Sequence, residues 1–65
     1  MKSIDSNPEL YNEAYQALVD QCEKDGYIFN EPDPDMCEIG TKYVYLRNRY
    51  RLLGKYDIKS KKIAD

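Results

Sequence analysis

The sequence contains no histidine and no tryptophan, and only two of its 65 residues are cysteines. Without histidine there is no Ser–His or Cys–His nucleophile pair, and no side chain has an ordinary pKa near neutrality. A chain of this size also has little room for the pocket of roughly 300–1,000 Å3 that holds a small substrate. The sequence therefore predicts a protein that is not an enzyme and has no catalytic residues.

The two cysteines, Cys22 and Cys37, are too few for a disulfide-rich secreted scaffold, and two thiols alone cannot close a tetrahedral zinc site. We expect Cys22 to be a small buried residue on a helix face. We expect Cys37 to be a half-exposed thiol beside Glu38, an acidic setting that does not activate it. A bridge between the two cysteines is the alternative, although such bonds are rare in a reducing compartment.

Long apolar runs are also missing. The N-terminal segment MKSIDSNPEL lacks the apolar core of a signal peptide, and no stretch approaches the ~20 apolar residues of a membrane span. We therefore expect a cytoplasmic protein that does not bind membranes.

The segment EPDPDMCE, residues 31 to 38, gathers acidic side chains around two prolines. Its alternating acids resemble the start of a calcium-binding loop, but the glycine and the distal bidentate glutamate of such a loop are missing. The prolines indicate a stiff acidic loop instead. We therefore predict no metal site and no cofactor.

Charge is divided unevenly along the chain. Residues 1–40 contain two basic residues against ten acidic ones, whereas residues 41–65 contain eight basic residues against two acidic ones. The net charge of −2 therefore hides halves of −8 and +6. This division indicates an interaction surface of one sign, or two halves that fold against each other and partly neutralise one another.

Residues 8 to about 25 have the pattern of an amphipathic helix. Asn7 is a good N-cap, Pro8 suits the first helical position, and Gly26 suits a left-handed C-terminal stop. Helical spacing places a set of apolar residues on one face, namely Tyr11, Ala14, Tyr15, Leu18 and Cys22. The opposite face is acidic, so we expect the apolar face to pack on a sheet with Leu18 at the centre of the contact.

Three strands are expected after the helix, over about 27–30, 42–48 and 51–58. YIFN at 27–30 is short and aromatic, and the prolines that follow it end the pattern. Between residues 44 and 52 alternate positions are apolar, apart from Asn48, which predicts one inward face: Val44, Leu46, Tyr50 and Leu52. Gly54 indicates a bulge or a close backbone approach. A helix over 42–53 is the alternative, but Tyr and Val favour a pleated surface.

The predicted fold class is thus α+β. An N-terminal amphipathic helix packs on a small three-stranded antiparallel sheet, within one small domain over residues 1–65. A domain this small has a thin core and often gains stability from a partner. We expect a monomer or a two-fold homodimer.

The stretch YVYLRNRYR interleaves tyrosine with arginine and predicts the partner-binding surface. In a strand its odd-numbered positions share the outward face: Tyr43, Tyr45, Arg47, Arg49 and Arg51. Tyrosine and arginine are enriched at protein–protein hot spots. The preferred function is therefore a small regulatory or accessory protein, of a bacterial or phage kind, that binds a protein partner. The alternative is a small module that binds RNA or single-stranded nucleic acid with the same face.

Overall fold

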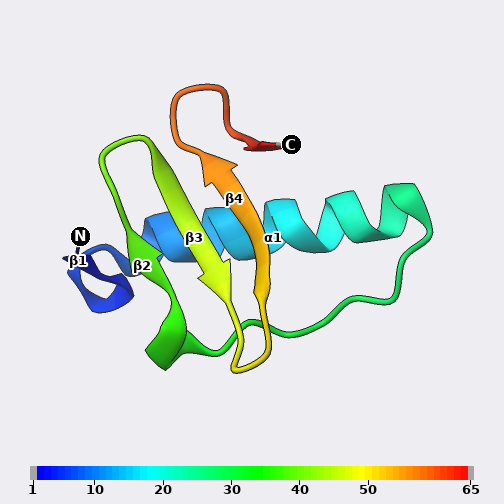
Figure 1. Ribbon diagram of the computed structural model, residues 1–65. Coiled ribbons are helices and arrows are strands. Elements are labelled where there is room, and N and C mark those ends of the chain that lie inside the picture. Colours follow the sequence, from blue (N-terminus) through cyan, green and yellow to red (C-terminus); the bar gives the residue numbers. More distant parts are fainter. Residues whose placement is uncertain (1, 65) are drawn as a thin grey trace.

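The computed structural model describes residues 2–64, which form one long helix and an antiparallel sheet (Figure 1). The elements follow in the order β1 (Lys2–Ser3), η1 (Ile4–Ser6), α1 (Pro8–Asp25), η2 (Pro34–Met36), β2 (Glu38–Ile39), β3 (Tyr43–Arg47), β4 (Leu52–Asp57) and β5 (Lys62–Ala64). The strands lie in the sheet in the same order as in the chain. The α+β class is confirmed, but the sheet has five strands and not three.

The helix α1 begins and ends at the expected residues. The side-chain oxygen of Asn7 accepts a hydrogen bond from the backbone N–H of Leu10 at 3.2 Å, and Pro8 opens the first turn. Gly26 ends the helix with a φ of 74°, a left-handed conformation that glycine adopts without strain. These signals act within a few residues of each helix end, so the sequence alone was sufficient to place both ends.

The prediction of a strand over 27–30 is wrong. This segment forms an irregular loop in which Tyr27 and Ile28 are 73% and 87% exposed. Tyr27 donates its backbone N–H to the oxygen of Cys22, which extends the helix cap, and Phe29 packs against the ring of Tyr15 at 5.5 Å. The segment thus follows the helix end, and no strand pairs with it among the described residues.

The prediction of strands in place of a second helix over 42–53 is confirmed, since β3 and β4 form an antiparallel hairpin. Asn48 closes its turn, because the side-chain oxygen accepts hydrogen bonds from the backbone N–H groups of Tyr50 and Arg51 at 2.9 and 3.0 Å. Asparagine favours such turns for this reason. The strands β1, β2 and β5 are two or three residues long, too short to show an alternating pattern in the sequence.

A bulge interrupts the hairpin where Gly54 had indicated one. Leu46 pairs with Gly54 and Arg47 pairs with Leu52, so Leu53 has no counterpart in β3. The extra residue reverses the alternation, and Leu53 packs against the core while Leu52 remains 45% exposed. The predicted inward positions of Tyr50 and Leu52 are therefore wrong, and Tyr50 is 84% exposed in the turn.

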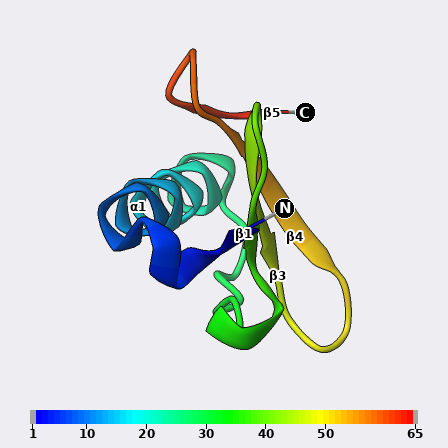
Figure 2. The same ribbon diagram turned by 90° about the vertical axis from the view of Figure 1, so that its left-hand side faces the viewer.

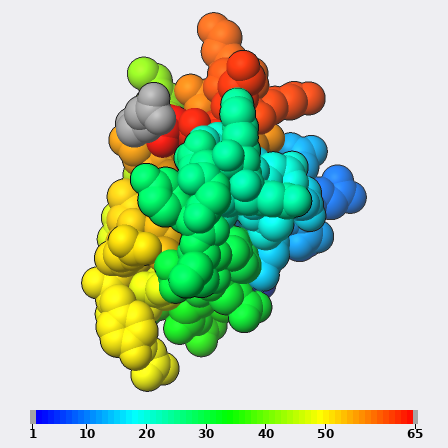
Figure 3. All heavy atoms as spheres, turned by 90° about the vertical axis from the view of Figure 1, so that its right-hand side faces the viewer, coloured from blue at the N-terminus to red at the C-terminus, as the bar shows by residue number. Residues whose placement is uncertain are grey.

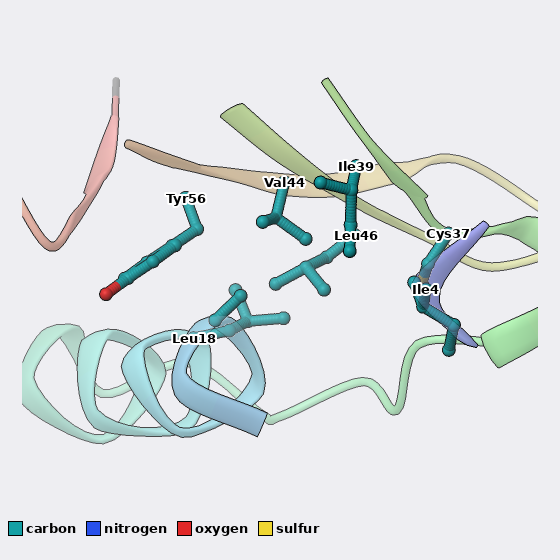
Figure 4. Close-up of a cluster of buried hydrophobic side chains, with 8 residues drawn as sticks. Ile4, Leu18, Cys37, Ile39, Val44, Leu46 and Tyr56 are labelled. Carbon is teal, nitrogen blue, oxygen red and sulfur yellow. The ribbon is translucent and has the colours of Figure 1, made fainter. Parts of the chain in front are cut away.

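The core lies between α1 and one face of the sheet (Figure 4). Val44 and Leu46 are fully buried and point from β3 towards Leu18 of the helix. Cys37 is also buried, at 4% exposure, so the expectation of a half-exposed thiol is wrong. Its sulfur lies 3.6 Å from the backbone oxygen of Arg47, because the loop before β2 folds back against the end of β3.

Candidate interaction surface

The helix covers one face of the sheet, and no element within residues 2–64 covers the other face (Figure 2). Directly paired residues of an antiparallel sheet point to the same side, so the bare side can be followed from the register. We call it the outer sheet face and define it by the residues Ser3, Glu38, Tyr43, Tyr45, Arg47, Leu52, Lys55, Asp57, Lys62 and Ala64.

Two tyrosine rings form the centre of the outer sheet face. The rings of Tyr43 and Tyr45 lie edge to face, with centroids 6.1 Å apart and an interplanar angle of 62°. The Nζ atom of Lys55 lies 4.9 Å from the Tyr43 centroid, and the Cζ atom of Arg47 lies 5.8 Å from the Tyr45 centroid. Both cations are within the distance at which a ring face attracts positive charge. The row of cation, ring, ring and cation is therefore held in place by its own contacts.

Three of the five predicted partner-binding residues lie on this face, and two do not. Tyr43, Tyr45 and Arg47 belong to β3 and share its outward side. Arg49 lies in the turn that Asn48 closes, outside both strands. Arg51 lines a groove on the helix side, together with Leu18 and Cys22 of α1. The prediction extended the alternation through the turn, where strand geometry no longer applies.

Lys55 is the member of the row that sequence reasoning missed. It pairs directly with Tyr45, but this pairing depends on the bulge at Leu53. Counting from the observed Arg47–Leu52 pair without the bulge would place Lys55 on the opposite face, whereas the predicted alternation with Leu52 inward, continued to Lys55, places it outward. Gly54 was the available signal for the bulge, although the sequence did not fix which residue was the extra one.

Two carboxylates flank the tyrosines on the outer sheet face. Glu38 of β2 pairs with Tyr45, and Asp57 of β4 pairs with Tyr43. One carboxylate oxygen of Asp57 also accepts hydrogen bonds from the backbone N–H groups of Lys59 and Ser60 at 2.9 and 3.1 Å. The face thus combines aromatic area with charges of both signs.

The acidic loop and the cysteines are the remaining chemically notable features. Within residues 2–64 no group of three or more His, Cys, Asp or Glu side chains is placed to hold a metal ion. Asp33 of the acidic loop uses its carboxylate to accept the backbone N–H of Asp35 at 3.0 Å. Burial raises the pKa of the Cys37 thiol, which disfavours the reactive thiolate. In the described part of the chain, no helix has the length and apolar character to cross a membrane.

Alkaline pH should destabilise the fold through Tyr11. Burial, followed by the neighbouring Cys37, raises the pKa of Tyr11 from 10.0 to about 12. The unfolded chain therefore loses this proton at a lower pH than the folded chain, so the free energy of unfolding falls as the pH rises from 10.0 towards 12. The Tyr11→Phe variant removes this proton, and its melting temperature should fall less steeply over the same pH range.

Tyr50→Phe is the matched control for the loss of a tyrosine hydroxyl, because Tyr50 is 84% exposed in the turn. Melting temperatures measured at stepwise increasing pH compare the three proteins. A Tyr11→Phe profile as steep as that of the parent would contradict the assignment.

Comparison with models of protein families, with curated proteins and with solved structures finds no match to this chain. The choice of function therefore rests on the chemistry of the outer sheet face and of the elements around it.

Proposed function

We propose that this chain is a non-enzymatic accessory or regulatory protein that binds a protein partner through the outer sheet face. The observation that carries the proposal is the tyrosine pair, Tyr43 and Tyr45, on the bare side of the sheet with a cation over each ring. Aromatic and arginine side chains supply most of the energy at the centres of protein interfaces. Here they lie together on a regular strand.

The preorganisation of the row favours binding. Tyr43, Tyr45 and Lys55 are each half-buried before any partner arrives, so their rotamers are already restricted by their neighbours. Ordering a free side chain at an interface costs about 0.5–1.5 kcal/mol. Side chains that are already ordered lose less conformational entropy on binding, so more of their contact energy remains as affinity.

A protein partner fits the row better than a nucleic acid does. Bases stack on open aromatic faces, whereas Arg47 and Lys55 each already occupy a face of Tyr45 or Tyr43. Glu38 and Asp57 flank the rings and would repel phosphates. The edges and hydroxyls of the rings remain available for the directed hydrogen bonds of a protein interface.

Tyr45→Ala and Lys55→Glu are expected to weaken partner binding, because each removes part of the central row. Truncation of a hot spot costs about 2 kcal/mol or more, which is roughly a thirtyfold loss of affinity. The measurement is affinity capture from a lysate of the source organism, followed by titration of the captured partner against each variant. Lys59→Glu is the matched control, since Lys59 is exposed in the turn before β5 and outside the outer sheet face.

Nuclease treatment and salt separate the two classes of partner. A protein partner should remain bound after nuclease treatment and should weaken only gradually with salt. Capture that disappears with nuclease and falls steeply with salt would indicate phosphate contacts and would overturn the proposal in favour of nucleic acid. If Tyr45→Ala and Lys55→Glu capture as much partner as the parent chain and melt at normal temperatures, the functional surface lies elsewhere.

A further inference from the structure

Strand β5 pairs with only the second half of β4, so the first half of β4 lies at an edge of the sheet within the described residues. Strand β5 pairs with Lys55, Tyr56 and Asp57. Within residues 2–64 the preceding segment of β4, Leu52–Gly54, therefore has a strand neighbour on the β3 side alone. A strand edge presents backbone N–H and C=O groups that an added strand can pair with.

A groove of about 200 Å3 lies beside this open segment. Its lining residues come from the helix, the loop after it and the start of β4: Leu18, Cys22, Tyr27, Ile28, Asn30, Arg51 and Leu53. In Figure 3 the loop (green) lies between the start of β4 (yellow) and the C-terminal part of α1 (teal). The groove therefore joins an open strand edge to an apolar floor.

The loop after α1 forms one wall of the groove, and contacts hold it in place on both sides of its exposed part. Tyr27 donates its backbone N–H to Cys22 at 3.0 Å, and Phe29 packs on Tyr15 with the ring centroids 5.5 Å apart. Further along, Asp33 donates its backbone N–H to the oxygen of Arg47 at 2.8 Å. Between these anchors Ile28 is 87% exposed, so a large apolar side chain is held at the groove without a cover in the described chain.

We propose that the open edge of β4 and this groove bind an extended segment of another protein as an added strand. The side chains that face the groove would be apolar and would pack on Leu53 and Ile28. Arg51 is the charged residue of the lining, and no carboxylate lines the groove with it. Charge complementarity therefore requires an acidic residue in the added segment near Arg51. This site lies on the helix side of the sheet and does not depend on the outer sheet face.

A second copy of the chain fits the edge poorly. Two copies of β4 paired antiparallel about Leu53 would each have to pair as far as Lys55 of the other copy. That position is already taken, because Lys55 pairs with Ala64 of β5. A short acidic strand from another protein, which pairs with Leu52–Gly54 alone, avoids this conflict.

The test is selection of a displayed library of random linear peptides on the full chain, followed by titration of capped synthetic copies of the enriched peptides. We expect peptides in which apolar residues alternate with polar ones and an acidic residue stands at one end. Methylation of the backbone nitrogens that face β4 should abolish binding, because it removes the donors of an added strand. Binding should also slow alkylation of Cys22, which lines the groove and is half-exposed.

Reversing the charge of Arg51 tests the expected acidic contact, and reversing that of Arg49 is the comparison. Arg51→Glu is expected to weaken the acidic peptides about tenfold and to change the selected charge from acidic to basic. Arg49→Glu is the matched control, since Arg49 is exposed in the same turn and does not line the groove. It should leave both affinity and consensus unchanged.

Three results would overturn the proposal: no enriched peptide, binding that survives backbone methylation, or an equal effect of the two charge reversals. A dimer in sedimentation that Arg51→Glu converts to a monomer would also overturn it, because a second copy would then be the occupant. The Tyr45→Ala variant should retain peptide binding, so failure of this site is distinguishable from failure of the outer sheet face.

Discussion

Replacing Leu46 with aspartate is expected to unfold most of the chain at neutral pH. Leu46 is fully buried between the sheet and α1, and an ionised carboxylate there has no partner. The effective cost of burying such a charge is several kcal/mol, against a total stability of about 5–15 kcal/mol for a whole domain. Circular dichroism and a denaturant titration measure the loss of folded protein.

Arg47→Asp is the matched control, because it places the same side chain at the next position of β3, on the outer sheet face. Arg47 is exposed, and its contact with the ring of Tyr45 is a cation–π contact at 5.8 Å. The loss of such an exposed contact costs about 0.5–1 kcal/mol, so this variant should stay folded. Similar melting temperatures for the two variants would show that the two faces of β3 are wrongly assigned.

Leu18→Ala is expected to lower the free energy of unfolding by about 2–5 kcal/mol, because it leaves a cavity that the surroundings only partly fill. Leu18 is 4% exposed and belongs to the buried cluster between α1 and the sheet. Denaturant unfolding of the parent and the variant gives the difference directly. A change below about 0.5 kcal/mol, the size usual for surface substitutions, would show that the helix does not pack through this residue.

Gly54→Ala provides a second test of the same contact. A Cβ atom at Gly54 would lie 3.2 Å from the Cδ1 atom of Leu18 and 3.5 Å from the Cγ2 atom of Ile63. In the parent chain this contact is tight and should be mildly destabilising. In the Leu18→Ala background the new methyl group enters the vacated space and should be stabilising.

The double-mutant cycle should therefore show a coupling energy of about 0.5–3 kcal/mol, as found for residues in contact. Strictly additive effects would contradict the close approach of β4 to the helix. Gly26→Ala is not a suitable control, because the φ of 74° at Gly26 adds backbone strain of its own.

The sequence by itself determined the features that depend on neighbouring residues. Asn7, Pro8 and Gly26 placed the ends of the helix, and alternation placed Val44 and Leu46 inside with Tyr43 and Tyr45 outside. Gly54 also marked the irregularity in the second strand of the hairpin. Caps, turns and alternation act over a few residues, so their signals are complete within a short window.

Only the tertiary structure decided the features that depend on distant partners. Residues 27–30 have the composition of a strand, but they follow the helix end and find no strand to pair with in the described chain. The short strands β1, β2 and β5 exist because neighbouring backbones lie alongside them.

The candidate surfaces depended on the same distant contacts. The pairing of β3 with β4 brought Lys55 to the ring of Tyr43, the bulge at Leu53 turned Leu52 outward, and the turn placed Arg51 beside α1 instead of on the outer sheet face. A strand is stabilised by its hydrogen-bonding partners, and a one-residue shift in pairing moves every later side chain to the other face. That register is set by contacts between segments far apart in the chain, which no local pattern encodes.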